Sequence, residues 1–247
     1  MFESPKFITS GISVVFERQR EIRKKQFDFE DALKDYYVQP QLISVPDDLD
    51  PEVPRLIFTS HHGFSQIIIT QINITLNVKY SEEWQIDIQK FGKPYMSDRI
   101  QLLFKLLSIV QPDLKANYCG SNIRAQLPFT GDDEELKKII LEKYYNPLKN
   151  GMNIYDLSLS IVRHIDGKYF NNLNISNYRT WKVDNRVKLN KFKASDATKR
   201  GLELTIDYND RLAFNNEDEY FSSEKTLYNI LDRGIIELFK EIQFAQS

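Results

Sequence analysis

Alternating apolar and polar residues predict a series of β-strands, each with one face in the protein core. The clearest alternation lies between Ile72 and Tyr80, where the polar positions are Asn73, Thr75, Asn77 and Lys79. Because successive side chains of a strand point to opposite sides, this segment predicts a sheet with one face in water. The same pattern predicts further strands at 12–16, 55–60, 64–70, 122–127, 157–165, 168–181 and 201–208.

Apolar residues at helical spacing predict helices at 27–37, 97–110, 133–145 and 223–244. In the second of these, Ser97 is the expected N-cap and Pro112 follows the end. The third has acidic residues in its first turn and lysines later, which matches the helix dipole. The last is long, and its wide apolar stripe contains Gly234 as a weak point.

These elements predict an α+β fold in which antiparallel sheet packs against helices and the chain closes on a long helix. An N-terminal half at 1–112 and a C-terminal half at 113–247 follow the same order of strand, helix, antiparallel strands and helix. A structural duplication explains this order. Chance recurrence explains it equally well, because no residue-level repeat accompanies it, and one continuous domain is an alternative to two halves.

Composition narrows the class of protein. The chain has 247 residues, of which 41% are hydrophobic and 28% charged, as is typical of a globular protein. Its formal net charge of -2 provides no bulk basic excess for nucleic-acid binding. Apolar runs are shorter than the roughly 18 to 20 residues that span a bilayer, and the N-terminus lacks a signal-peptide core. With a single cysteine, Cys119, and hence no internal disulfide, we expect a cytoplasmic protein without membrane insertion.

Residues that carry catalysis or hold a metal form no motif in this sequence. The phosphate-binding loops G-x-x-x-x-G-K-[ST] and G-x-G-x-x-G do not occur, and His and Cys do not have zinc-ligand spacing. His61 and His62 are interpreted as the tip of a hairpin that Gly63 sharpens. We therefore expect no cofactor, no metal and no catalytic residue.

Weaker candidates for chemistry lie on the predicted strands. His164 and Asp166 are two residues apart, so the carboxylate would be on the same sheet face as the imidazole that it orients. Asp166-Gly167 is more typical of a turn, however. Cys119 lacks the sequence context of known thiol nucleophiles and is interpreted as a small, half-buried side chain.

The strongest local signal for binding is a basic segment at 179–200, in which aromatic residues interleave with cations. Its candidate binding residues are Arg179, Trp181, Lys182, Arg186, Lys188, Lys191 and Lys193. Nucleic acid or another anionic partner would bind such a segment. A solvated, lysine-rich hairpin has the same sequence, and Asp184 and Asp196 dilute its positive charge.

The order of features resembles that of a sporadically distributed family of uncharacterised bacterial proteins of about this length. The resemblance depends on Ser4-Pro5 before a first strand that ends Val14-Val15-Phe16-Glu17, on the hairpin 57–60 and 67–69, on the strand 74–80 with Trp84, and on the helix 227–239. Lys6 and Ser10 stand where the family has a second proline and an acidic residue. The resemblance implies no activity, and the patchy distribution of the family implies at most a role on mobile elements or in phage defence.

We expect a cytoplasmic binding or regulatory protein that presents a water-facing sheet and the basic segment to a macromolecular partner. A protein partner or self-association is expected first, nucleic acid at 179–200 is a further candidate, and no membrane partner is expected. The alternative is a hydrolase or nuclease whose site is assembled from residues distant in sequence.

Overall fold

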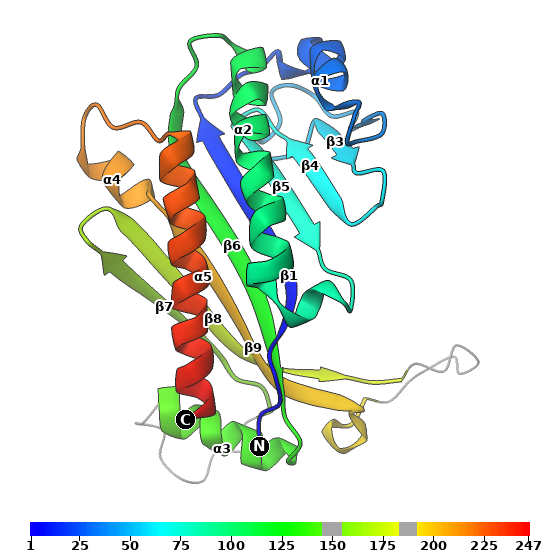
Figure 1. Ribbon diagram of the computed structural model, residues 1–247, viewed down its shortest axis with the longest axis vertical. Helices are drawn as coiled ribbons and strands as arrows, with labels where there is room; N and C mark the ends of the chain where they lie inside the picture. The colour runs from blue at the N-terminus through cyan, green and yellow to red at the C-terminus, as the bar shows by residue number, and fades with distance from the viewer. Residues whose placement is uncertain (145–154, 183–191) are drawn as a thin grey trace.

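The fold is built on a nine-stranded antiparallel sheet with long helices on one side (Figure 1). The structure is a computed structural model that describes residues 1–144, 155–182 and 192–247. The strand order is β2-β3-β4-β5-β1-β6-β9-β8-β7. The predicted α+β class, with antiparallel strands and a long C-terminal helix, is confirmed. Among the described residues, no helix is long and apolar enough to cross a membrane.

Each half contributes a strand, a helix and further strands in that order, followed by one helix in the first half and two in the second. The first half contains β1 (Lys6–Phe16), α1 (Gln26–Leu33), β2 (Gln41–Leu42), β3 (Leu56–Thr59), β4 (Ser65–Ile69), β5 (Asn73–Lys79) and α2 (Lys93–Val110). The second contains β6 (Ala116–Pro128), α3 (Asp133–Tyr144), β7 (Ser158–Ile165), β8 (Tyr169–Thr180), β9 (Lys199–Asn209), α4 (Arg211–Asn216) and α5 (Glu224–Gln246). Short helical turns lie at Ile22–Lys25, Trp84–Ile86, Ile88–Gly92 and Ala194–Asp196.

The centre of the sheet is the antiparallel pair of β1 and β6, one strand from each half. Ile12 lies opposite Ser121 in this pair. Outward from the centre, the first half continues with β5, β4 and β3, and the second half continues with β9, β8 and β7. In both halves, therefore, the first strand pairs with the last strand of the following meander. The two halves share one topology, and one continuous sheet contains both of them.

Apolar side chains between the sheet and the helices form the core. α2 packs on β1 and β5, and α5 packs on β6 and β9 (Figure 1). The sheet contributes buried side chains from inward positions of these strands, including Ile12, Val14, Ile74, Leu76, Ile123, Ala125, Leu204 and Ile206. The predicted stripe of α5 is buried at Leu227, Ile230, Leu231, Ile235, Leu238 and Ile242. The helices thus cover one side of the sheet and leave the other side to solvent.

α2 begins earlier than the apolar spacing predicts. The helical turn before it is capped by Asp87, whose carboxylate accepts a hydrogen bond from the Lys90 amide at 3.0 Å. Pro94 lies at the start of α2, where a missing N–H costs no helical hydrogen bond. Ser97 is consequently an interior residue, and its predicted role as the N-cap is wrong.

Gly234 lies where α5 approaches β6 closely. A Cβ atom at this position would lie 2.8 Å from the Ser121 Oγ and 3.4 Å from the Tyr208 Cβ. We predict that Gly234→Val lowers the free energy of unfolding by about 2 kcal/mol, because the added side chain overpacks this contact. Asn229→Val, at an exposed position of the same helix, should change it by less than about 0.5 kcal/mol. Urea denaturation measures both variants, and equal stabilities would contradict the prediction.

Candidate functional site

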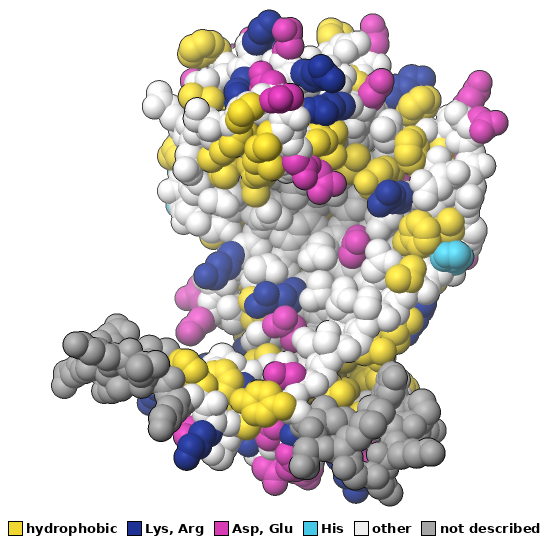
Figure 2. Space-filling model, turned by 180° about the vertical axis from the view of Figure 1, so that it is seen from behind, with side chains coloured by type: hydrophobic (Ala, Val, Ile, Leu, Met, Phe, Trp, Pro, Cys, Tyr) yellow, Lys and Arg dark blue, Asp and Glu magenta, His cyan; other side chains and the backbone are white. Residues whose placement is uncertain are grey.

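The side of the sheet opposite α2 and α5 is named the open face. α4 borders this face at one end, where the Phe214 and Tyr118 rings lie 5.8 Å apart. Figure 2 shows mainly neutral side chains and backbone at its centre, with few charged groups. The open face consists of Thr9, Gly11 and Ser13 of β1, Asn73, Thr75, Asn77 and Lys79 of β5, Asn122, Arg124 and Gln126 of β6, Asn172 and Asn174 of β8, and Glu203, Thr205 and Asp207 of β9.

Cross-strand register brings carboxamide side chains into one row across the open face. Asn77 of β5 lies opposite Gly11 of β1, which in turn lies opposite Asn122 of β6. Asn122 lies opposite Asp207, and Asp207 opposite Asn172 of β8. Side chains directly opposite each other in a sheet are close enough to interact. Residues from both halves of the chain thus form a single polar row.

Glycines lower the floor of the open face beside the central pair of strands. A Cβ atom at Gly11 would lie 2.9 Å from the Asn77 Oδ1. At Gly120, a Cβ atom would lie 3.3 Å from the Asn209 Cβ and 3.4 Å from the Ser13 Oγ. Neighbouring side chains therefore occupy the space that a larger residue would need, and both glycines are buried beneath them.

Two shallow cavities lie on the open face, one on each side of the central pair. The first has a volume of about 460 Å³ and is lined by residues that include Tyr118, Gly120, Phe170, Asn172 and Asp207. The second has a volume of about 390 Å³, and its lining includes Gly11, Gln66, Asn77, Lys79 and Asn122. Small-molecule sites in proteins typically have volumes of about 300–1,000 Å³. The cavities offer hydrogen-bonding groups above a floor that contains glycine.

Charged groups on the open face are held largely by their neighbours. The Asp207 carboxylate accepts a hydrogen bond from each of Asn172 and Asn209, both at 3.1 Å. The Arg124 Nε lies 3.2 Å from the Glu203 carboxylate. Because these charges have partners within the protein, the open face presents mainly neutral donors and acceptors to solvent, with Lys79 as a further cation at its side.

The alternation of polar and apolar residues in the sequence predicts the part of the open face that β5 contributes. Asn77 and Lys79 are exposed, and Asn73 and Thr75 are half-buried, as the alternation of β5 predicts. The contribution of β1 was missed, and the predicted strand at 122–127, which lies in β6, was not linked to this face. The signal for both strands was the alternation of small and polar residues at Thr9, Gly11 and Ser13 and again at Gly120, Asn122 and Arg124.

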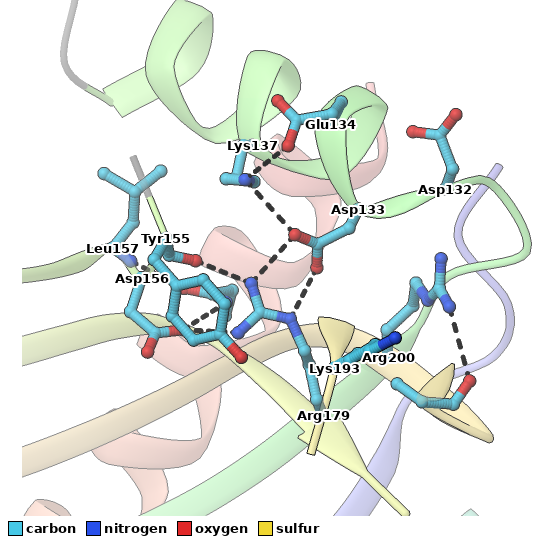
Figure 3. A network of polar contacts seen from close by, with 12 residues as sticks. Asp132, Asp133, Glu134, Lys137, Tyr155, Asp156, Leu157, Arg179, Lys193 and Arg200 are labelled. Atoms are coloured by element: carbon cyan, nitrogen blue, oxygen red, sulfur yellow. Dashed lines mark hydrogen bonds and ion pairs between the residues drawn. The ribbon is translucent and has the colours of Figure 1, made fainter. Parts of the chain in front are cut away.

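Arg179 of the basic segment is buried in an ion-pair network (Figure 3). Its Nε and Nη2 donate to the two oxygens of Asp133 at 2.6 and 2.8 Å, and its Nη1 donates to Asp156 at 2.5 Å. Only 3% of its side chain is exposed. The hydrogen bonds from Arg179 hold the pKa of the Asp133 carboxyl below its usual value. Arg179 therefore joins α3 to β8, and its guanidinium is already engaged.

The other residues of the basic segment divide into described and undescribed positions. Arg186, Lys188 and Lys191 lie outside the described residues. Trp181 donates from its indole Nε1 to the Lys193 carbonyl at 2.8 Å, which joins the two described ends of the segment. Lys182 is exposed beside it. These ends project from the body of the molecule (Figure 1).

The histidines and their acidic neighbours do not converge on one site. The exposed His164 packs its ring against Phe170, with centroids 5.2 Å apart. Asp166 instead accepts a hydrogen bond from Arg233 at 2.6 Å. His61 is exposed at the predicted hairpin turn, where Gly63 has a φ of 73°. Within the described ranges, no group of three or more His, Cys, Asp or Glu side chains is placed to hold a metal ion.

Cys119 lies on the helix side of β6 and is completely buried. Its backbone N–H donates to the buried Asp210 carboxylate at 2.6 Å, and the Tyr220 hydroxyl donates to the same carboxylate at 2.6 Å. Burial raises the pKa of the Cys119 thiol and also that of Asp210. The prediction of a half-buried side chain underestimated the burial of Cys119, because α5 and the segment after α4 cover this end of β6.

We predict that Arg179→Met lowers the free energy of unfolding by about 3 kcal/mol at neutral pH, because it leaves Asp133 buried without its bidentate partner. The lowered pKa of Asp133 stabilises the fold above the unfolded value of 3.8 and ceases to do so as the pH falls through the folded pKa. The difference from wild type should therefore shrink in acid. Urea denaturation at neutral pH and in acid measures this difference, with the exposed Lys182→Met as the control. Equal losses of unfolding free energy in both variants would contradict the prediction.

We predict that Cys119 of the folded protein does not react with Ellman's reagent at mildly alkaline pH. Its thiol is buried and its pKa is raised, so both access and the thiolate form are suppressed. The same preparation in guanidinium chloride should release one equivalent of thiolate per chain. Rapid reaction of the native protein would show that this end of β6 opens.

Comparison with known protein families finds no family model that matches this chain, and no curated protein matches it significantly. The candidate site is therefore defined by geometry. It is the open face, with its carboxamide row and the cavities on either side of the central strands.

Proposed function

We propose that this protein is a binding protein whose open face engages a protein partner. The observation that carries the proposal is the one-sided helix layer: α2 and α5 cover one side of the sheet, and the other side presents neutral hydrogen-bonding groups from both halves. An antiparallel sheet with one wet face needs no partner to be stable. Gly11, Gly120 and the two cavities give this face a concave shape, which a face in contact only with water does not require.

The charge distribution favours a protein over a polyanion as the partner. The centres of protein interfaces are depleted of charged residues, whereas nucleic-acid binding requires Lys and Arg that neutralise phosphates. On the open face, Arg124 is paired with Glu203, and Asp207 adds negative charge. Its remaining cation, Lys79, lies beside the second cavity.

Nucleic acid at the basic segment is the second candidate. The observation that favours it is the projection of Lys182 and Lys193 from the body of the molecule, with the half-exposed Phe192 beside Trp181. Arg179 supports the fold of this region instead of adding a free cation. Stacking on such aromatic rings and salt-dependent binding would characterise this candidate.

A photo-crosslinking amino acid at Asn122 tests the main proposal, with the same amino acid at Gln101 on the exposed side of α2 as the control. We predict that position 122 alone crosslinks a specific protein in the native host. With that protein purified, Asn77→Arg combined with Asn122→Arg should weaken binding by about tenfold or more, because charge and bulk are introduced at the interface centre.

The matched control combines Gln101→Arg with Asn229→Arg, which adds the same charges on the helix side. This variant should bind like wild type. Equal loss of binding in both double variants, or crosslinking from both positions, would contradict the role of the open face. Excess absorbance at 260 nm in protein purified without nuclease would instead favour the basic segment.

A further inference from the structure

The two halves treat the outer edge of the sheet differently. In the first half, the chain between α1 and β3 returns along the outer edge of β3. The Val38 amide donates to the Thr59 carbonyl at 2.9 Å, β2 pairs with β3, and the Ile43 amide donates to the Arg55 carbonyl at 3.1 Å. Leu56 and Phe58 of β3 are completely buried. The first half thus closes its own edge.

In the second half, the corresponding outer strand is β7, which ends the sheet (Figure 1). All eight of its residues pair with β8 on the inner side. Among the described residues, none forms a backbone hydrogen bond with the outer edge of β7. Leu159, Ile161 and Ile165 remain half-exposed on the helix side, since α5 packs on β6 and β9. Val162 is 60% exposed on the other side.

β7 has few of the features that usually prevent edge strands from pairing. Proline, lysine, bulges and inward-pointing charges protect the edges of natural sheets. Between Ser158 and Ile165 there is no proline or lysine, and the pairing with β8 has no register shift. Arg163 is the only Lys or Arg in this strand, and its guanidinium donates to Glu241 of α5 at 2.5 Å. The edge is therefore regular, and its one inward-pointing cation is already paired with Glu241, so the outer backbone groups of β7 are available to another strand.

We propose that β7 pairs antiparallel with β7 of a second copy of this chain across a two-fold axis. In such a pair, the same residues meet from both sides. With Val162 opposite its own copy, Leu159 lies opposite Ile165, Ser160 opposite His164, and Ile161 opposite Arg163. No two like charges face each other. On the half-exposed helix side, Leu159 meets Ile165, and Ile161 meets Arg163, whose guanidinium is engaged by Glu241. The strand is therefore complementary to itself.

This pairing goes beyond the proposed protein-binding role and does not depend on it. A two-fold axis normal to the sheet keeps both open faces on the same side of the joined sheet. The carboxamide rows of the two copies would then lie in line, separated by the two Val162 side chains on the axis. An edge of eight residues is short, and interfaces of this kind are small, so the dimer forms in a concentration-dependent way.

Size-exclusion chromatography with light scattering, from low-micromolar to sub-millimolar protein, tests the proposal. The mass of wild-type protein should rise from 29.1 kDa towards twice that value as the concentration increases. Val162→Lys should weaken association at least tenfold, because two lysines would meet on the axis. Ile86→Lys, which replaces a 69%-exposed isoleucine in the first half, should associate like wild type.

Hydrogen exchange provides the second measurement and does not require a variant. Amides of β7 should become more protected as the concentration of wild-type protein rises. A monomeric mass at every concentration would overturn the proposal and leave β7 to an extended segment of another protein. Association that survives Val162→Lys, or that Ile86→Lys weakens equally, would also overturn it by placing the interface elsewhere.

Discussion

The pairing of β1 with β6 is the constraint on which the rest of the fold depends. It joins the first strands of the two halves at the centre of one sheet, with Ile12 opposite Ser121. Without this pair, each half would have an exposed hydrogen-bonding edge and a core open on one side. The close approach of α5 at Gly234 is set on the same strand, because Ser121 lies beneath that glycine. Sheet pairing and helix packing therefore fix each other at the centre of the molecule.

A one-sided helix layer gives the two faces of the sheet different chemistry. Alternation along each strand sends side chains such as Ile74 and Leu76 under the helices and Thr75 and Asn77 to the open face. On an isolated strand this pattern would mean only that one side is wet. Pairing of β5, β1, β6, β9 and β8 turns it into a continuous neutral surface, on which the proposed function is based.

Because the two halves share one topology, equivalent strands can be compared between them. The first half covers the edge of β3 with the chain that includes β2, while the described part of the second half leaves the outer edge of β7 unpaired. The second half contains a different contact, in which Arg179 of β8 binds Asp133 of α3. Equivalent topology thus supports different chemistry at opposite ends of the sheet.

By itself, the sequence determined the features that depend on neighbouring residues. These include the alternation of β5, the hairpin turn at Gly63 and the extent of α5, whose N-cap Ser223 accepts a hydrogen bond from the Thr226 amide. Tertiary structure alone decided the pairing of β1 with β6 and the burial of Arg179 against Asp133. The physical reason is separation along the chain: a local pattern records which side of an element is apolar, but a contact between distant segments depends on how the whole sheet assembles.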